Sequence, residues 1–402
     1  MDGNTETMYG SPAEVEFCKR CVMSNQKASS SVEFKHNKKH KHKTLILEDG
    51  ICDACRYAEW KDKNVDWEKR EDDLIRLLEK HRRSDGRYDV LVPGSGGKDS
   101  GFASHILKYK YGMNPLTVTW APHIYTDIGW KNFQDWIGIG GFDNVLFTPN
   151  GRVHRLLTRL AFVNLLHPFQ PFIIGQKILA PKIAKQYGIN LIFYGENEAE
   201  HGNPIVDNKS PLRNKNYYSE SDVSKLYLSG VSLRELIDKY DLSLNDLDIY
   251  IPLTEADCEK SGIEIHYLGY YLKWTPQEAY YYSVENTGFQ ANYERSEGTY
   301  TKFSSLDDKI DGFHFYTTYI KFGINRATYD ASKDIRNHHI TREEGVALVK
   351  RFSGEFPTKY FKEFLDYIDI SENDFQELTD SARPPHLWER NEGEWKLKYQ
   401  VS

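Results

Sequence analysis

The 402-residue sequence lacks a hydrophobic run long enough to cross a lipid bilayer. Its most apolar stretch, residues 160–179, is interrupted by two prolines and by His167, Gln176 and Lys177. The first sixteen residues are polar and acidic, without the apolar centre of a signal peptide, so we expect a cytoplasmic protein. Basic residues are also fewer than acidic residues. The chain has 52 Lys and Arg against 59 Asp and Glu, and its net charge of −7 argues against broad nucleic-acid binding.

Cysteine is scarce, and four of the five cysteines form two Cys-x-x-Cys pairs, Cys18 with Cys21 and Cys52 with Cys55. In a reducing compartment this pattern favours metal ligands over disulfides. Two such pairs complete a four-sulfur site. We expect structural Zn²⁺, with an iron–sulfur cluster as the alternative. Alternating runs at residues 31–34 and 44–47 predict the hairpin of a zinc ribbon, which we place at residues 17–62.

The tip of this hairpin, residues 35–43, consists almost entirely of lysine and histidine. It could contact phosphate or a metal. Because runs of charge are usually solvated, we expect a mobile surface loop.

The most informative motif is the string Ser95, Gly96, Gly97, Lys98, Asp99 and Ser100. It follows a strand-like apolar run, residues 88–92, and opens a helix-like run, residues 99–111. A glycine-rich turn there directs backbone N–H groups, hydroxyls and a lysine to one point, where the helix N-terminus adds partial positive charge. The motif therefore predicts a phosphate-binding turn. It is not a Walker A loop, because Asp99 follows the lysine and Val92 stands where the first glycine belongs.

Strands and helices alternate around this turn. Strands are expected at residues 89–92, 116–120, 144–148 and 190–194, and helices at 66–83 and near 99–111, 130–140, 152–167 and 176–187. This order predicts an α/β domain, residues 63–202, with a doubly wound parallel sheet. Ligands of such sheets lie at the carboxyl ends of the strands, where the turn at Ser95, Thr119 and residues 195–198 would meet.

The remaining segments differ in character from this domain. Residues 1–16 are expected to form a flexible N-terminus. Residues 203–219 are a polar linker, and capping-box patterns at 275–278 and 341–344 predict a mostly helical C-terminal substrate domain, residues 203–402.

The string at residues 95–100 resembles the SGGxDS loop of the PP-loop ATP pyrophosphatases, which have a HUP-like sheet. From about residue 17 to residue 357 the chain also resembles the N-acetyl sugar amidotransferase family of that superfamily. The strings that carry this resemblance are residues 17–24, 52–56, 194–197, 267–271, 297–300, 307–311 and 340–345. The family is associated with bacterial surface-polysaccharide pathways, either lipopolysaccharide O-antigen or nonulosonic acids.

The resemblance implies that ATP and ammonia convert a sugar acetamido group into an acetamidino group. Adenylylation makes the amide oxygen a good leaving group, ammonia displaces AMP, and pyrophosphate is the other product. On this basis the expected phosphate contacts are Ser95, Gly96, Gly97 and Ser100. Lys98 would compensate charge, and Asp99 would act through Mg²⁺ or by fixing the loop. Thr119, Gly195 and Glu196 would complete the ATP site.

Several other polar groups are candidates for the substrate site. Glu196, Glu198, Glu200 and His201 either orient ATP, metal or sugar or merely cap the next helix. For Asp307, Asp308 and Asp311 a solvated turn is favoured over a cation site. Five basic residues are also candidates: Arg295, Lys302, Lys321, Arg326 and Arg336. We expect most of them to form surface salt bridges, and one or two to bind a carboxylate or phosphate of the substrate.

The fifth cysteine, Cys258, lies neither on a glycine-flanked turn nor at the N-terminus, so it is a poor candidate for a glutaminase nucleophile. We therefore expect a separate glutaminase subunit to supply ammonia, and a sugar or nucleotide-sugar as the other partner. The alternatives are a tRNA thiolase, which needs further cysteines and is disfavoured by the negative charge, and another adenylating amide ligase.

Overall fold

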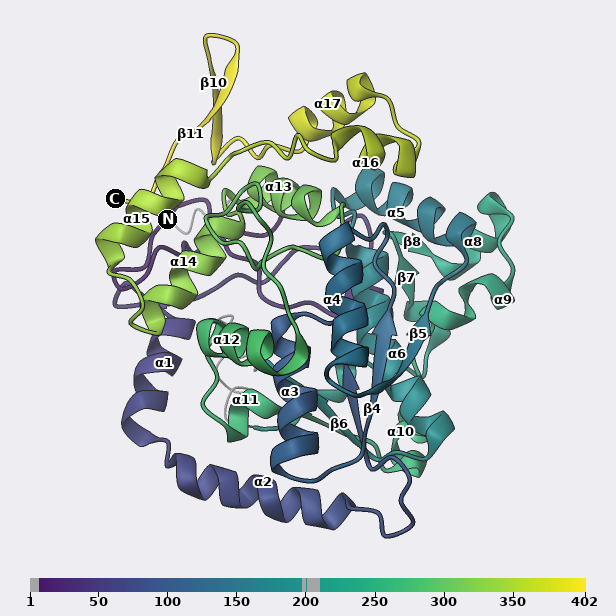
Figure 1. The fold of residues 1–402 in the computed structure, drawn as a ribbon. Coiled ribbons are helices and arrows are strands. Elements are labelled where there is room, and N and C mark those ends of the chain that lie inside the picture. Colours follow the sequence, from purple (N-terminus) through teal and green to yellow (C-terminus); the bar gives the residue numbers. More distant parts are fainter. Residues whose placement is uncertain (1–6, 197–199, 201–209) are drawn as a thin grey trace.

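The protein is described here by a computed structural model that covers residues 7–196, 200 and 210–402. A five-stranded parallel sheet lies at its centre, in the order β5-β4-β3-β6-β9 (Figure 1). The strands are β3 (Val90–Pro93), β4 (Pro115–Trp120), β5 (Asp143–Phe147), β6 (Leu191–Tyr194) and β9 (Glu264–Tyr267). The first four lie within about a residue of their predicted positions, which confirms the predicted α/β class.

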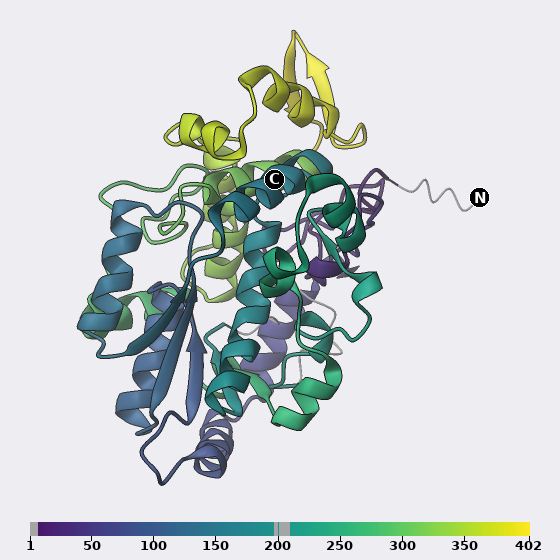
Figure 2. The same cartoon turned by 90° about the vertical axis from the view of Figure 1, so that its right-hand side faces the viewer.

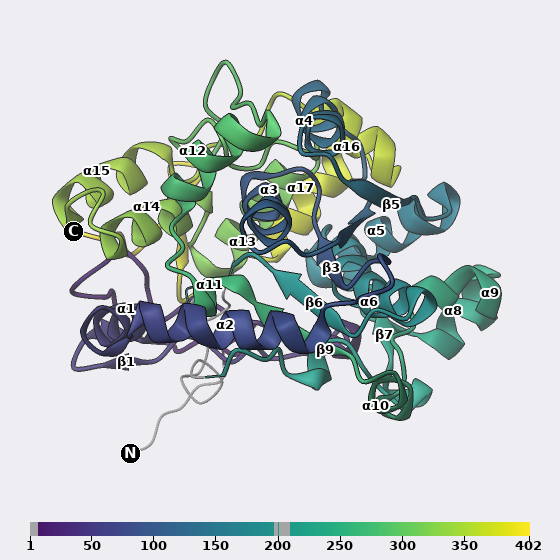
Figure 3. The ribbon, with the colours of Figure 1, turned by 60° about the horizontal axis from the view of Figure 1, so that its bottom comes forward.

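Helices cover both faces of the sheet because its strands alternate between two cores. Val90 and Val92 of β3 pack with residues of α2 (Trp67–His81) and α3 (Lys98–His105), whereas Leu91 packs with residues of α5 (Gly151–Leu165) and α6 (Gln170–Tyr187). Figure 3 shows α2 beside α11 (Leu268–Tyr271). The sheet is therefore doubly wound, as predicted.

The fifth strand was not predicted. β9 follows residue 202, yet it pairs along its whole length with β6. The predicted boundary at residues 202 and 203 therefore leaves one strand of the sheet in the segment assigned to the helical C-terminal domain. Residues 201–209, which begin the predicted linker, lie outside the described residues.

The rest of the chain after β6 is mainly helical, as expected. Its two small hairpins are β7 (Tyr227–Leu228) with β8 (Val231–Ser232) and β10 (Trp388–Asn391) with β11 (Glu394–Leu397). Figure 2 shows the last helices and β10–β11 gathered at one end, where α16 packs against α5. The helices are α8 (Leu233–Tyr240), α9 (Leu244–Leu247), α10 (Glu255–Ser261), α12 (Pro276–Thr287), α13 (Asp311–Phe322), α14 (Arg326–Arg336), α15 (Arg342–Phe352), α16 (Phe361–Ile368) and α17 (Glu372–Ser381).

The N-terminal segment differs from the predicted hairpin. In its described part β1 (Leu47–Glu48) pairs with β2 (Ile51–Cys52), just before α1 (Asp53–Asn64), and isolated antiparallel bridges join Phe17 to Ser24 and Ala28 to Thr44. Residues 33–35 form a 3-10 turn instead of a strand. The reason is tertiary packing: Phe34 is buried in the main core, and Gln170 of α6 donates a hydrogen bond to the carbonyl of Glu33.

The tip at residues 35–43 is not uniformly solvated, so that expectation was wrong for its histidines. Lys38, Lys39, Lys41 and Lys43 are exposed, but His36 is only 3% exposed. The segment is also anchored by a bridge between Asn37 and Gly230.

Two further sequence expectations concern the chain start and the membrane. Residues 1–6 of the expected flexible N-terminus lie outside the described residues, whereas the Tyr9 hydroxyl donates a hydrogen bond to the carbonyl of Ala382. Among the helices of the described part, none combines the length and apolar character that a bilayer crossing requires.

Candidate functional site

The turn between β3 and α3 has a shape that only glycine permits at one position. Gly96 has a φ of +86°, and a Cβ there would lie 2.7 Å from the Cα of Phe133. Before the turn, the Gly94 N–H donates to the Val118 carbonyl at 2.9 Å, which extends the β3–β4 pairing. The turn thus leaves β3 at the carboxyl edge of the sheet and leads directly into α3.

Lys98 and Asp99 form the first turn of α3. The Lys98 ammonium lies 2.6 Å from Oδ2 of Asp99. The other oxygen, Oδ1, is buried and has no hydrogen-bond partner among the described residues. Because an unpaired buried carboxylate oxygen is costly, its position fits a site where a bound cation completes the coordination. α12 supports this turn from outside, since the Ser283 hydroxyl donates to the Lys98 carbonyl at 2.7 Å.

Two adjoining cavities open beside this turn. The smaller, of about 390 Å³, is bounded by the turn, by the ends of β4 and β6, and by α6. The larger, of about 670 Å³, extends from Lys98 towards α13, α14 and the N-terminal segment. Asp99 and Glu196 line both cavities. This placement, at the carboxyl ends of β3 and β6 where the strand order changes direction, is the usual ligand position in such sheets.

The structure brings most of the predicted ATP-site residues to these cavities. Those that line the smaller one are Ser95, Gly97, Asp99, Ser100, Gly195 and Glu196. Lys98 lines the larger cavity, and Gly96 shapes the turn without lining either.

Thr119 is the exception among the predicted ATP-site residues. It is fully buried, and its hydroxyl accepts a hydrogen bond from Asn144 at 3.0 Å. Successive residues of a strand face opposite sides, so Val118 and Trp120 line the smaller cavity in its place. The alternation of β4 was the sequence signal that could have identified them.

The four-residue polar cluster after β6 is only partly described. Glu196 pairs with Lys333 of α14 at 3.1 Å, and Glu200 forms a buried ion pair with Lys61 of α1 at 2.6 Å. Glu198 and His201 lie outside the described residues.

The three aspartates at residues 307–311 are not a solvated turn, so that expectation was wrong. All three line the larger cavity. Asp308 is buried and accepts hydrogen bonds from the backbone N–H of His123 and, at 2.7 Å, from its ring. The segment packs against the chain that follows β4, where Tyr125 forms an isolated antiparallel β-bridge with Asp308. Burial raises the pKa of Asp307, and the nearby hydroxyl of Ser95 in the turn opposes this shift.

Burial also raises the pKa of Asp311, from its usual 3.8 to about 6, although the guanidinium of Arg326 opposes the shift. The folded protein therefore binds this proton more tightly than the unfolded chain does. Well below pH 3.8 the group is neutral in both states. As pH rises through 6, its contribution to the free energy of unfolding falls by about 1–2 kcal/mol.

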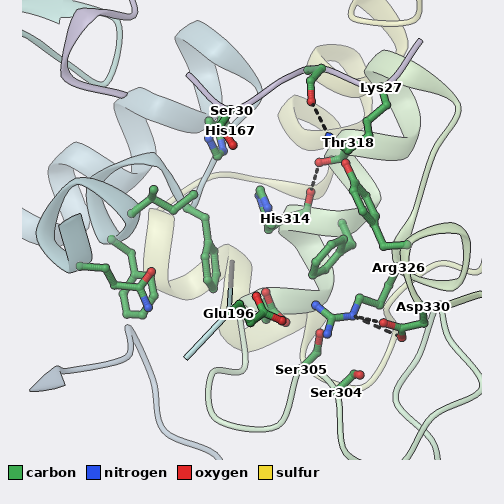
Figure 4. A pocket seen from close by; sticks show the side chains of 18 of the residues that line it. Lys27, Ser30, His167, Glu196, Ser304, Ser305, His314, Thr318, Arg326 and Asp330 are labelled. Carbon is green, nitrogen blue, oxygen red and sulfur yellow. Dashed lines mark hydrogen bonds and ion pairs between the residues drawn. The ribbon is translucent and has the colours of Figure 1, made fainter. Parts of the chain in front are cut away.

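We expect Asp311→Asn to remove this part of the pH dependence in the ligand-free protein. Melting temperatures of the variant and the parent, measured from pH 4.5 to pH 7.5, should diverge in favour of the variant as pH rises. Arg326 also pairs with Asp330, Nε to Oδ1 at 3.2 Å (Figure 4), so the substitution should not leave its guanidinium without a partner. Parallel pH profiles for the two proteins would contradict the assignment.

Of the five basic candidates, Lys321 and Arg326 line the larger cavity, together with Lys333 and Lys27, which the sequence did not single out. Burial lowers the pKa of Lys27 and that of Lys321, each to about 8. The other three have protein partners: Arg295 pairs with Glu355, Lys302 donates to the Tyr293 carbonyl, and Arg336 donates to the Glu200 carbonyl. The larger cavity thus combines carboxylates with ammonium and guanidinium groups.

The four clustered cysteines converge as their spacing predicts. Their sulfur atoms all lie within 4.8 Å of one another, with Cys18 to Cys55 at 3.9 Å and Cys21 to Cys52 at 3.7 Å. In a tetrahedral site with metal–sulfur bonds of about 2.3 Å, sulfur atoms are about 3.8 Å apart. The N–H groups of Arg20 and Cys52 point at the Cys18 sulfur. This cluster can bind a metal ion.

Comparison with known proteins adds one match to a family. Residues 297–401 match the family of LPS biosynthesis proteins described as WbpG-like, C-terminal domain. This match confirms the resemblance to proteins of surface-polysaccharide biosynthesis. No curated protein matches the sequence.

Solved structures with a similar arrangement are distant. An NH3-dependent NAD synthetase from Campylobacter jejuni is 15% identical, with a TM-score of 0.27, and the match covers 34% of this chain and 59% of that one, less than two thirds of its length. NMN synthetase from Francisella tularensis is 15% identical, with a TM-score of 0.27 and coverage of 62% and 94%. The U34-tRNA thiolase NcsA from Methanococcus maripaludis, solved with its [4Fe-4S] cluster, is 12% identical, with a TM-score of 0.29 and coverage of 74% and 84%.

Proposed function

We propose that the protein is an ATP-dependent amidotransferase that converts an acetamido group of a sugar into an acetamidino group during surface-glycan biosynthesis. The observation that supports this most is the wall shared by the two cavities. There the phosphate-type turn and Asp99, whose buried Oδ1 has no hydrogen-bond partner among the described residues, border both the smaller cavity and the larger, more polar one.

The smaller cavity is the proposed ATP site. Its apolar lining of Val118, Trp120 and Leu179 suits an adenine ring, and the turn at its other side suits phosphate. Asp99 would hold Mg²⁺, which neutralises the departing pyrophosphate. Ser95, Gly97 and Ser100 would contact phosphate, and Lys98 would compensate charge.

The larger cavity is the proposed sugar site. Its volume of about 670 Å³ and its mixture of carboxylates and cations suit a hydroxyl-rich substrate that carries a carboxylate or phosphate. Arg326 and Lys333, which line this cavity, are the candidate anion contacts. The match of residues 297–401 to a lipopolysaccharide-biosynthesis family supports a glycan precursor as substrate.

We assign structural Zn²⁺ to the four cysteines. An iron–sulfur cluster places several iron atoms between its thiolates and needs more room than sulfur contacts of 3.7 and 3.9 Å leave. If these four cysteines bind zinc, Cys258 is the remaining cysteine that could act as the reactive thiol of a thiolase or a glutaminase. It is 1% exposed, and burial raises its pKa, which favours the unreactive thiol.

The test is an assay with Mg²⁺-ATP, ammonium and a panel of acetamido sugars, free and nucleotide-linked. We expect AMP and pyrophosphate, and a sugar product in which one oxygen is replaced by NH, detected by mass spectrometry. ADP and orthophosphate, or a thiolated tRNA base, would reject the proposal.

A second arm of the assay replaces ammonium with glutamine. The chain alone should not use glutamine, so a separate glutaminase is the proposed partner. Cys258→Ala is the matched control and should keep the ammonium-dependent activity. Glutamine-dependent turnover that this variant loses would show that the ammonia source had been assigned to the wrong protein.

A further inference from the structure

The lysine- and histidine-rich segment between the cysteine pairs holds a group of side chains that the proposed function does not use. We propose that His36, His40 and His42 form a second metal site, separate from the four cysteines, which binds a divalent first-row transition metal such as Zn²⁺. This inference does not depend on the proposed reaction.

The geometry gathers three imidazoles from one short segment. Their ligand atoms lie within 4.8 Å of one another, and the ring centroids of His36 and His40 are 3.8 Å apart. Imidazole donors around a tetrahedral metal are about 3.3 Å apart, so binding requires a modest contraction. Residues 38–43 contain no helix or strand, so the side chains of His40 and His42 can move towards His36, which stands next to the anchored Asn37.

Unpaired nitrogens indicate that these rings need a ligand. His36 Nε2 and His42 Nδ1 are buried, and neither has a hydrogen-bond partner among the described residues. The His36 side chain is only 4% exposed. Ring stacking satisfies the faces of the imidazoles but leaves these edge atoms unpaired, which is costly in a protein interior.

Glu33 places a carboxylate beside these rings. Its Oε2 lies 3.3 Å from His36 Nδ1 but makes no hydrogen bond to any described residue, so it too is a buried polar atom left unpaired. In metal sites a carboxylate at this edge of an imidazole commonly orients the other nitrogen towards the metal, and metal binding at Nε2 would favour that hydrogen bond here. Glu33 also brings negative charge near the site, whereas Lys321 is the nearby cation.

The site would be open on one side. His36 and His42 line the larger cavity, which Lys98 of the turn also borders. Three protein ligands leave a fourth coordination position, which is typical of zinc sites that bind water or a ligand oxygen. An oxygen-bearing molecule in the larger cavity is the ligand class that this position would take.

The experiment counts metal ions in the whole chain. Purified protein is stripped with a chelator, reloaded with Co²⁺ and desalted, and its cobalt content and absorption spectrum are recorded. We expect two Co²⁺ per chain, one for each group of ligands. Only the cysteine site should show sulfur-to-cobalt charge-transfer absorption.

Variants assign each ion to its site. His40→Ala, at a half-exposed position, should lose one Co²⁺ and keep the charge-transfer band, and His42→Gln should do the same if the first change disturbs folding. His338→Ala is the control, because that side chain is 83% exposed and should leave the count at two. One Co²⁺ per chain in the parent protein, or an unchanged count in both histidine variants, would overturn the proposal.

Discussion

Replacing Asp99 with asparagine is expected to lower the rate of ATP-dependent pyrophosphate release by about 100-fold or more, the usual effect of losing one charge-stabilising group in an active site. The change keeps the shape of the side chain and removes its charge. Asp99 lines both cavities, and its buried Oδ1 has no hydrogen-bond partner in the described part of the chain, so the carboxylate is placed to hold a cation rather than to support the fold. Pyrophosphate release, measured against Mg²⁺ concentration, tests this.

The two roles considered for Asp99 give different results. If Asp99 holds Mg²⁺, the variant should require more Mg²⁺ while its melting temperature stays near that of the parent. If it only fixes the loop through Lys98, the melting temperature should fall instead. Asp127→Asn, at the first residue of α4 (Asp127–Gly138), is the matched control, since Asp127 borders neither of the two cavities. Full activity of Asp99→Asn would refute the assigned site.

The sheet around the turn could be predicted because local patterns determine it. Apolar runs and helical periods identified β3 to β6 and the helices between them, and the order of these elements predicted a parallel sheet. β9 was not predicted because it lies far along the chain, among helices and beyond the predicted end of the α/β domain. Its membership depends on pairing with β6, which no local pattern reveals.

The composition of the site was less predictable than its position. Charged segments are expected to be exposed to solvent. This expectation was wrong for the aspartates near residue 308 and for the histidines near residue 36. In both cases distant elements bury the segment: the backbone of His123 meets Asp308, and Gln170 holds the carbonyl of Glu33 beside His36. Such contacts join residues more than a hundred positions apart, so they cannot be predicted from the sequence around each segment.

The cysteine cluster also lies next to the larger cavity, which sequence spacing alone did not reveal. It packs in one apolar group with Ile324, Tyr329 and Ile335, residues on or beside α14. The same helix carries Arg326, Asp330 and Lys333, which line the larger cavity. The cysteine cluster therefore packs against the helix that forms a wall of the proposed sugar site.

Replacing Cys21 with serine is accordingly expected to remove the metal of this cluster and to lower the melting temperature by about 10 °C or more. A structural metal contributes many kcal/mol to folding, and each lost kcal/mol lowers the melting temperature of a domain by about 2–4 °C. The variant should also lose activity, because α14 loses its support. Zinc analysis, thermal melting and the ammonium-dependent assay measure the three effects. Cys258→Ser, at an equally buried cysteine outside the cluster, is the control and should keep the metal. A folded Cys21→Ser protein that retains its zinc would show that the four sulfurs do not act as one site.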